Sequence, residues 1–440
     1  MTKKLIGILL YCIILPAILP AQELLSLEET IRLSLEKNFN IYVARKNVDI
    51  SQNNHTRGNA GSLPQVNFNA GYSGSIINSK IEFLDGRNQN VSGANNTRYN
   101  ASIAATWTIF DGLVMFDRYN QLGINREIAN LNLRLEMESV LQQIISTYYD
   151  IVQKEQTLKV FRQNLLVSQQ RVDIAQDRYE LGVFSKMDLL RAQVDRNNDS
   201  TLVINQRQTI FEAKTNLNSL LNRPAETSFM VEDTIQLRTT LEYETLKQKL
   251  DFQNTTLQLS RKNLSSSELD LRIAKGNTLP QVNLDLSYDF ARSKSGAGFA
   301  RTNRSIGPAY GIRFNYPIFD GNNRKREIAN AQINKEVVEE NIGANQNIIA
   351  AQYEIAYKDY LRNLELYQLE RYNADVAQQN LDIAIDKFRL GGLSALDFRD
   401  IQQDALDASN RLIVVLYQIK LNEIELLRVS GELVKESGEN

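Results

Sequence analysis

The sequence has very few of the residues on which most enzymes and metalloproteins depend. Its 440 residues include one cysteine, Cys12, and one histidine, His55. These counts exclude disulfide scaffolds, histidine-rich metal sites, and the Ser-His-Asp and Cys-His catalytic arrangements. A catalytic site built only from carboxylates stays compatible with the composition. We therefore expect no enzyme, no cofactor and no resident metal ion.

An excess of charge of either sign is also lacking. The 50 Lys and Arg residues are balanced by 52 Asp and Glu residues, which leaves a net charge of −2. Without a basic surplus, nucleic acid is not an expected partner. Proline is scarce too, with seven residues in the whole chain. Because proline interrupts helices, this scarcity leaves room for very long ones.

Residues 1–21 have the pattern of a secretory signal peptide. Lys3 and Lys4 precede an apolar run, and Ala21 offers a small residue for cleavage. A transmembrane anchor is the alternative, but it needs about 20 apolar residues. Cys12 has no small residue before it, so we do not expect it to carry a lipid. No later stretch resembles a membrane helix, so entry into a membrane would require β-strands.

The chain contains two copies of one unit, recognised by short segments that recur 200 to 216 residues apart. These segments are residues 63–67 and 279–283 (LPQVN), 109–112 and 318–321 (IFDG), and 126–130 and 326–330 (REIAN). Such a period is far longer than that of solenoid repeats. We expect repeats at 22–222 and 246–431, an intervening linker at 223–245 and a C-terminal tail at 432–440.

Each copy contains two segments in which apolar and polar residues alternate. These segments are residues 64–73 and 99–109 in the first copy and 281–290 and 306–318 in the second. A period of two indicates strands. Lengths of about ten residues suit outer-membrane strands that have one face toward lipid and one toward water. A soluble sandwich with one buried face is the alternative.

The segments between the paired strands, residues 74–98 and 291–305, are rich in Asn, Ser, Gly and Arg. This composition predicts exposed loops. Four strands cannot close a membrane barrel, because the smallest have about eight. Lipid does not tolerate open sheet edges. If the strands cross a membrane, the barrel must be shared between chains.

Most of the remaining sequence is predicted to be helical. Long helices are expected at about 112–179 and 321–388, and about 67 residues at 1.5 Å each give a rod of about 100 Å. Apolar residues recur along both at coiled-coil spacing. Shorter helices are expected before each strand pair, at about 26–60 and 241–277. The IFDG segments mark the strand-to-helix junctions, with predicted N-caps Asp111 and Asp320 followed by Gly112 and Gly321.

Taken together, these features resemble the TolC family of outer-membrane efflux proteins. The resemblance rests on the duplication, the strand pair between helices, and two motifs of the first copy. These motifs are W-x-x-F-D-G at 107–112 and Y-x-x-G-x-x-S-x-x-D at 179–188. It implies a mainly α homotrimer with a shared 12-stranded outer-membrane β-barrel and a long helical barrel that extends into the periplasm. The linker at 223–245 would form part of an equatorial region.

The resemblance also implies a function and partners. It predicts an outer-membrane exit duct for small molecules, docked onto a periplasmic adaptor and an inner-membrane pump. Two alternatives stay open: the outlet of a type I protein secretion system, and a coiled-coil surface scaffold without a channel. The polar strand faces favour a duct, because a wet pore requires them.

The family's periplasmic tip supplies the candidate site. Its aperture carries aspartates at positions that match Asp397 and Asp400, which are three residues apart and share a helix face. The alternative is that both are ordinary acids favoured at a helix start. The candidate tip and adaptor-contact residues are Gly182, Val183, Asp188, Phe388, Gly391, Gly392 and Leu393.

This sequence departs from the family at its gate. The family ties its tip shut partly with a tyrosine and an arginine, whose matching positions here are Phe388 and Leu393. Neither side chain can form a hydrogen bond. We therefore expect apolar packing where the family uses polar contacts.

Overall fold

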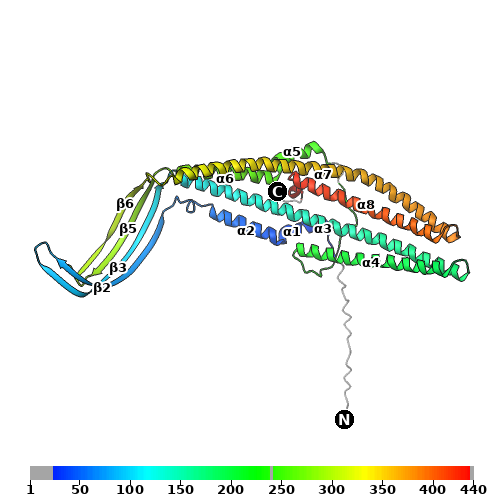
Figure 1. Ribbon diagram of the computed structural model, residues 1–440, viewed down its shortest axis with the longest axis horizontal. Coiled ribbons are helices and arrows are strands. Elements are labelled where there is room, and N and C mark those ends of the chain that lie inside the picture. Colours follow the sequence, from blue (N-terminus) through cyan, green and yellow to red (C-terminus); the bar gives the residue numbers. More distant parts are fainter. Residues whose placement is uncertain (1–22, 238–240, 437–440) are drawn as a thin grey trace, which may run out of the picture. The chain divides into compact units, whose positions relative to one another are not determined.

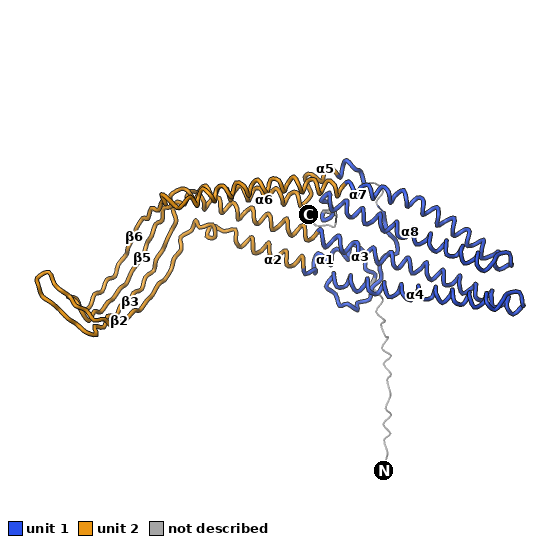
Figure 2. The backbone as a smooth tube through the Cα atoms, in the orientation of Figure 1, with its two compact units in different colours: residues 1–39, 138–246, 354–440 blue, residues 40–137, 247–353 orange. Residues whose placement is uncertain are grey.

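The computed structural model describes residues 23–237 and 241–436 and divides into two compact units (Figures 1 and 2). Unit 1 comprises residues 1–39, 138–246 and 354–440, and unit 2 comprises residues 40–137 and 247–353. Each unit contains one part of the long helix α3 (Val114–Glu180) and one part of α7 (Asn323–Leu390). Both sequence copies therefore contribute to both units. The predicted signal peptide, residues 1–21, lies outside the described residues.

Unit 2 contains one four-stranded antiparallel sheet. Its strands are β2 (Gln65–Glu82), β3 (Asn88–Phe110), β5 (Gln281–Lys294) and β6 (Thr302–Asn315). Their order is β2-β3-β5-β6, so the hairpins of the two copies join through β3 and β5. Within one chain, β2 and β6 are the edges of this sheet. The second-copy strand ends at Asn315, three residues before its predicted end, and Pro317 follows, which has no N–H to donate.

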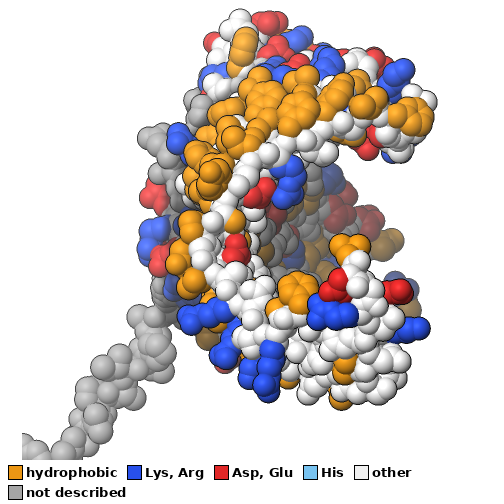
Figure 3. Space-filling model, turned by 90° about the vertical axis from the view of Figure 1, so that its left-hand side faces the viewer, with side chains coloured by type: hydrophobic (Ala, Val, Ile, Leu, Met, Phe, Trp, Pro, Cys, Tyr) orange, Lys and Arg blue, Asp and Glu red, His pale blue; other side chains and the backbone are white. Residues whose placement is uncertain are grey.

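The two faces of this sheet differ in chemistry. Residues paired directly across strands share a face, and on one face Phe68, Ile103 and Tyr288 lie side by side. These side chains are more than half exposed in the chain. The other face is polar, and there Asp285 accepts from Thr106 at 3.1 Å and pairs with Arg313 at 3.0 Å. Figure 3 shows hydrophobic side chains gathered along the sheet and charged ones in its hollow.

The prediction of a long loop at 74–98 was wrong. Strands β2 and β3 continue through most of it, and only residues 83–87 form a turn. Ile76, Ile81 and Val91 favour strand, but the intervening Asn and Ser residues obscured the alternation. A bulge interrupts the pairing near Asn78, whose side chain accepts from the Gly93 amide at 2.8 Å. The second predicted loop, 291–305, is likewise reduced to residues 295–301.

The shorter helices are each divided in two. The first is α1 (Leu27–Lys37) and α2 (Phe39–Asn54), and the second is α5 (Tyr243–Gln253) and α6 (Thr255–Gly276). The sequence predicted one helix in each place. Asn38 and Asn254 separate the halves, because each has an extended ψ. The Asn254 side chain also caps α6 by accepting from the Leu257 amide at 3.0 Å.

Unit 1 contains two helical hairpins, in which α4 (Lys186–Leu220) returns along α3 and α8 (Ala395–Val429) returns along α7 (Figure 2). A short helix α9 (Leu433–Glu436) follows. Strand β1 (Glu23–Leu24) pairs in parallel with β4 (Phe229–Met230). The buried Tyr148 hydroxyl fixes both flanking segments, since it donates to the Leu25 carbonyl and accepts from the Glu232 amide, each at 3.1 Å.

Among the residues that the structure describes, no helix combines the length and apolar character needed to cross a membrane.

Candidate functional site at the turns between the long helices

Both hairpins turn in the same way. Gly182 and Gly391 end the long helices with φ values of 75° and 88°, a left-handed conformation that favours glycine. Three residues later, Ser185 and Ser394 cap the returning helices by accepting from the amides of Asp188 and Asp397. The recurring Gly-x-x-Ser-x-x-Asp spacing therefore specifies a short helix-to-helix turn.

The two candidate aperture residues, Asp397 and Asp400, differ in their contacts within the described part of the chain. The Asp397 carboxylate accepts from the Ser394 hydroxyl at 2.7 Å, as Asp188 does from Ser185. Asp400 is exposed and has no hydrogen bond or ion pair within the described part of the chain. The helix-start alternative therefore applies to Asp397 within one chain. Both carboxylates stay exposed on α8.

Phe388 is the centre of an apolar cluster near the turns. It is 1% exposed and packs against Phe398 and Phe184, with ring centroids 4.8 and 6.0 Å away. The Arg178 guanidinium lies over the rings of Phe184 and Phe388, at 4.9 and 5.4 Å from their centroids. Leu393 packs against the same cluster. Apolar and cation–π contacts thus join the two hairpins where Phe388 and Leu393 lack polar groups.

Other side chains at the turns face solvent. Val183 is 70% exposed, Leu390 86% and Leu396 67%. Gly392 donates its amide to the Lys387 carbonyl at 2.9 Å and completes the second turn. The turns of both hairpins therefore expose apolar side chains to solvent.

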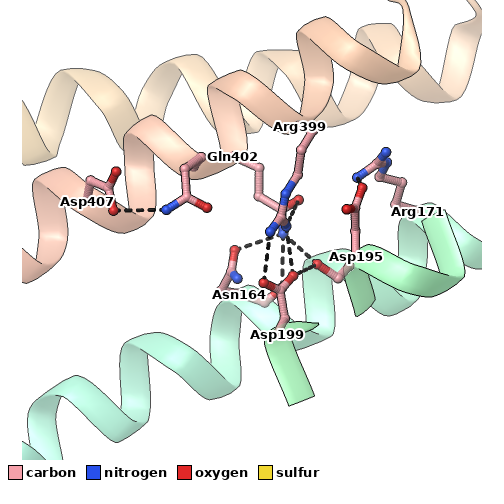
Figure 4. A network of polar contacts seen from close by, with 9 residues as sticks. Asn164, Arg171, Asp195, Asp199, Arg399, Gln402 and Asp407 are labelled. Carbon is pink, nitrogen blue, oxygen red and sulfur yellow. Dashed lines mark hydrogen bonds and ion pairs between the residues drawn. The ribbon is translucent and has the colours of Figure 1, made fainter. Parts of the chain in front are cut away.

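A buried polar network, which the sequence analysis missed, joins the same two hairpins farther from the turns (Figure 4). Arg399 on α8 donates two hydrogen bonds to Asp199 on α4, at 2.8 and 3.1 Å. Gln402 on α8 donates to Asn164 at 2.8 Å and to Ser168 at 2.7 Å, both on α3. We call these five residues the interhairpin network.

The interhairpin network is closed to solvent over most of its members. Asp199 is 1% exposed, Ser168 1% and Gln402 0%, and the Ser168 hydroxyl also donates to Asp199. Burial lowers the pKa of Arg399, but the hydrogen bonds and charge of Asp199 outweigh it and raise the pKa above its ordinary value. Arg399 therefore stays charged, and the network fixes how the two hairpins align.

A sequence signal for this network existed. Asp199 follows Leu189 and Ala192 and precedes Val203 at steps of three, seven and four, so it occupies a seam position of α4. A polar residue in such a seam predicts a buried partner. The pattern does not say which residue of the other hairpin supplies it.

The strand-to-helix junctions differ between the copies. Asp320 caps α7 by accepting from the Arg324 amide at 3.0 Å and side-chain Nε at 2.9 Å. The prediction that Asp111 caps α3 was wrong: within the described residues its carboxylate accepts no hydrogen bond from the first turn of α3, and one of its oxygens is buried without a partner. The residue that matches Arg324 is Met115, which has no guanidinium group to hold the carboxylate.

Comparisons with known proteins agree with this architecture. The family described as "Outer membrane efflux protein" matches residues 30–223 and 246–432, once for each sequence copy. The chain is similar to outer membrane protein TolC of Escherichia coli (strain K12), with 18% identity over 78% of this chain and 72% of that protein. TolC of Vibrio cholerae is 20% identical over 86% of this chain and 84% of that protein.

A solved structure shows the same fold. Outer membrane protein VceC from Vibrio cholerae matches with a TM-score of 0.76 and 14% identity, over 92% of this chain and 96% of that one. The family sequence pattern covers most of this chain in two copies, and the sheet and paired hairpins have the fold of TolC-like outer-membrane channels. This chain is therefore a member of the outer membrane efflux protein family and an outer-membrane channel protein.

Proposed function

We propose that the protein is the outer-membrane exit duct of a tripartite efflux system and passes small molecules outward as a homotrimer. The observation that carries this proposal is the sheet in unit 2, with one exposed apolar face and one polar face. An apolar face suits lipid, and a polar face lined by residues such as Asp285 suits a water-filled passage.

Trimerisation would remove the open edges of the sheet. Strands β2 and β6 each have one unpaired side within the chain. Unpaired backbone groups are costly in lipid, so pairing β6 of one chain with β2 of the next would stabilise a closed twelve-stranded sheet. The returning helices offer a further contact between chains, since Val194, Ile204 and Phe211 on α4 are each more than half exposed.

Asp397 and Asp400 are proposed to line the aperture of this duct. Three copies would bring six carboxylates around one axis, and such rings favour cations. We expect wild-type protein in planar lipid bilayers to conduct ions with a preference for cations and to be blocked by multivalent cations. Replacing both residues with alanine should weaken the preference and the block together.

The measurement is the reversal potential across a salt gradient. Asp188→Ala is the matched control, because it removes the equivalent capping carboxylate from the other hairpin. Protein that does not conduct would contradict the duct itself. Equal selectivity in wild type and the double variant would instead contradict only the aperture assignment.

The turns are proposed to contact the periplasmic adaptor. We expect Val183→Asp to reduce efflux in intact cells, because it places a charge on an exposed apolar surface that another protein would cover. Leu393→Asp tests the second turn, although Leu393 also packs against the Phe388 cluster. The readout is drug accumulation at equal amounts of protein in the outer membrane.

Arg362→Ala serves as a control away from the turns, since Arg362 is exposed on α7 and forms a surface ion pair with Asp359. Normal efflux by both turn variants would place the docking surface elsewhere on the protein.

A further inference from the structure

Three basic side chains lie on the apolar face of the sheet, at the end of the strands away from the helices. They are Arg292 and Lys294 on β5 and Arg304 on β6, and all three are exposed. In the register of the sheet, Arg292 lies directly opposite Arg304 on β6 and opposite Tyr99 on β3. Residues two apart along a strand share a face, so these cations share the face of Phe290.

The position of these cations matches the boundary of a lipid bilayer. Below them on β5, every second residue from Val282 to Phe290 is apolar. This run covers about 27 Å along the strand at ~3.4 Å per residue. At the tilt of about 35–45° that outer-membrane strands adopt, this length corresponds to a height of about 19–22 Å, close to the apolar band of about 25 Å. Because the helices extend into the periplasm, Arg292 lies at the level of the outer-leaflet headgroups.

The chain itself does not neutralise this charge. Arg292 and Arg304 lie directly opposite each other on neighbouring strands. Like charges in this arrangement destabilise a sheet. None of the three cations has an ion pair among the described residues. Their neighbours on this face are not acidic, and these are Tyr72, Gly74, Thr97, Tyr99 and Thr302. An anion from outside the chain would remove the repulsion.

We propose that Arg292, Lys294 and Arg304 bind the phosphate groups of an anionic lipid in the outer leaflet. One guanidinium group can donate to two oxygens of a phosphate at once, and two arginines side by side suit such a ligand. Arg304 also lies over the Phe290 ring, 5.7 Å from its centroid, and this contact holds the guanidinium at the edge of the apolar band. The Tyr72 and Tyr99 rings, 4.9 Å apart, extend the site along the same row.

The proposal rests on the outer-membrane placement of the sheet and not on transport. Its test is binding of diphosphoryl lipid A to the full-length protein in neutral detergent, followed by native mass spectrometry. We expect Arg292→Gln/Arg304→Gln to bind at least tenfold more weakly than wild type. Arg292→Lys/Arg304→Lys should retain most of the binding, because it keeps the charge.

Arg98→Gln is the matched control. Arg98 is exposed and lies opposite Ser293 in the register of the sheet, so it is next to Arg292 and Lys294 but on the polar face. We expect it to bind as wild type does. Equal weakening by Arg98→Gln would overturn the proposal, because it would mean that net charge alone attracts the lipid. Unchanged binding by the glutamine double variant would overturn it as well.

Two further ligands separate the possible sources of phosphate. Phosphatidylcholine, which carries no net charge, should not compete with lipid A. Inorganic phosphate at millimolar concentration should displace little of it, because it makes no contact with the apolar band. Displacement by inorganic phosphate alone would show a site for free anions and overturn the assignment to lipid. Channel conductance, recorded in parallel, should be the same in wild type and in the two Arg292/Arg304 double variants, because both positions lie on the apolar face.

Discussion

Replacing Arg399 with alanine should destabilise unit 1 by about 3 kcal/mol, the lower end of the cost of breaking a buried ion pair. The lower end applies because the Arg399 side chain is 21% exposed. Among the described residues, the change leaves the Asp199 carboxylate, which is 1% exposed, with the Ser168 hydroxyl as its one remaining partner. The measurement is the midpoint of thermal or denaturant unfolding, followed by circular dichroism in detergent.

A matched pair of variants separates the network from surface charge. Arg362→Ala removes an exposed arginine whose partner Asp359 is also exposed, so it should cost less than about 1 kcal/mol. Replacing both charged network residues, as Asp199→Leu/Arg399→Met, should recover much of the lost stability, because no unpaired charge then stays buried. An Arg399→Ala protein as stable as Arg362→Ala would show that the network contributes nothing to stability.

The same variant bears on opening of the duct. The interhairpin network joins α8 to α3 and α4, so separating the hairpins near the turns would break the Arg399–Asp199 contact. Under the proposed function, the Arg399→Ala channel should therefore have a higher open probability than wild type in single-channel records. The Phe388 cluster stays intact in this variant and would hold the turns in part.

Much of the fold could be predicted from the sequence because its signals are local. The scarcity of proline allowed α3 and α7, and Gly182 and Gly391 ended them. The structure begins these two helices two residues after their predicted starts. Local patterns failed at β2 and β3, where exposed Asn and Ser residues lie inside paired strands. There the strands are extended by pairing between β2 and β3, which local sequence does not encode.

The candidate site was less predictable because its contacts join distant segments. The turns at Gly182 and Gly391 have local signatures, and the sequence placed Phe388 and Leu393 at the second one. The interhairpin network does not, since Asp199 and Arg399 are 200 residues apart. Periodicity marks Asp199 as a buried polar residue, but only packing of the two hairpins identifies Arg399 as its partner.

The repeated IFDG segment allows a prediction in which one copy controls for the other. Gly112 and Gly321 both have left-handed φ values, 77° and 71°. An alanine Cβ at Gly112 would lie 2.2 Å from the Gly276 carbonyl oxygen and 2.9 Å from the Leu279 Cβ. At Gly321 the nearest atom would be the Asn323 side-chain nitrogen, 3.8 Å away.

Gly321→Ala should therefore cost only backbone strain, about 1–2 kcal/mol. Gly112→Ala adds a collision with the backbone of α6, which cannot move as a flexible side chain would. We expect its total cost to exceed about 3 kcal/mol and to reduce sharply the amount of folded protein in the outer-membrane fraction. Gly276→Ala should act like Gly112→Ala, because its Cβ would lie 2.8 Å from the Gly112 carbonyl oxygen. If the Gly112→Ala and Gly321→Ala proteins reach equal amounts in the outer-membrane fraction, the contact between Gly112 and Gly276 does not position the sheet on its helices.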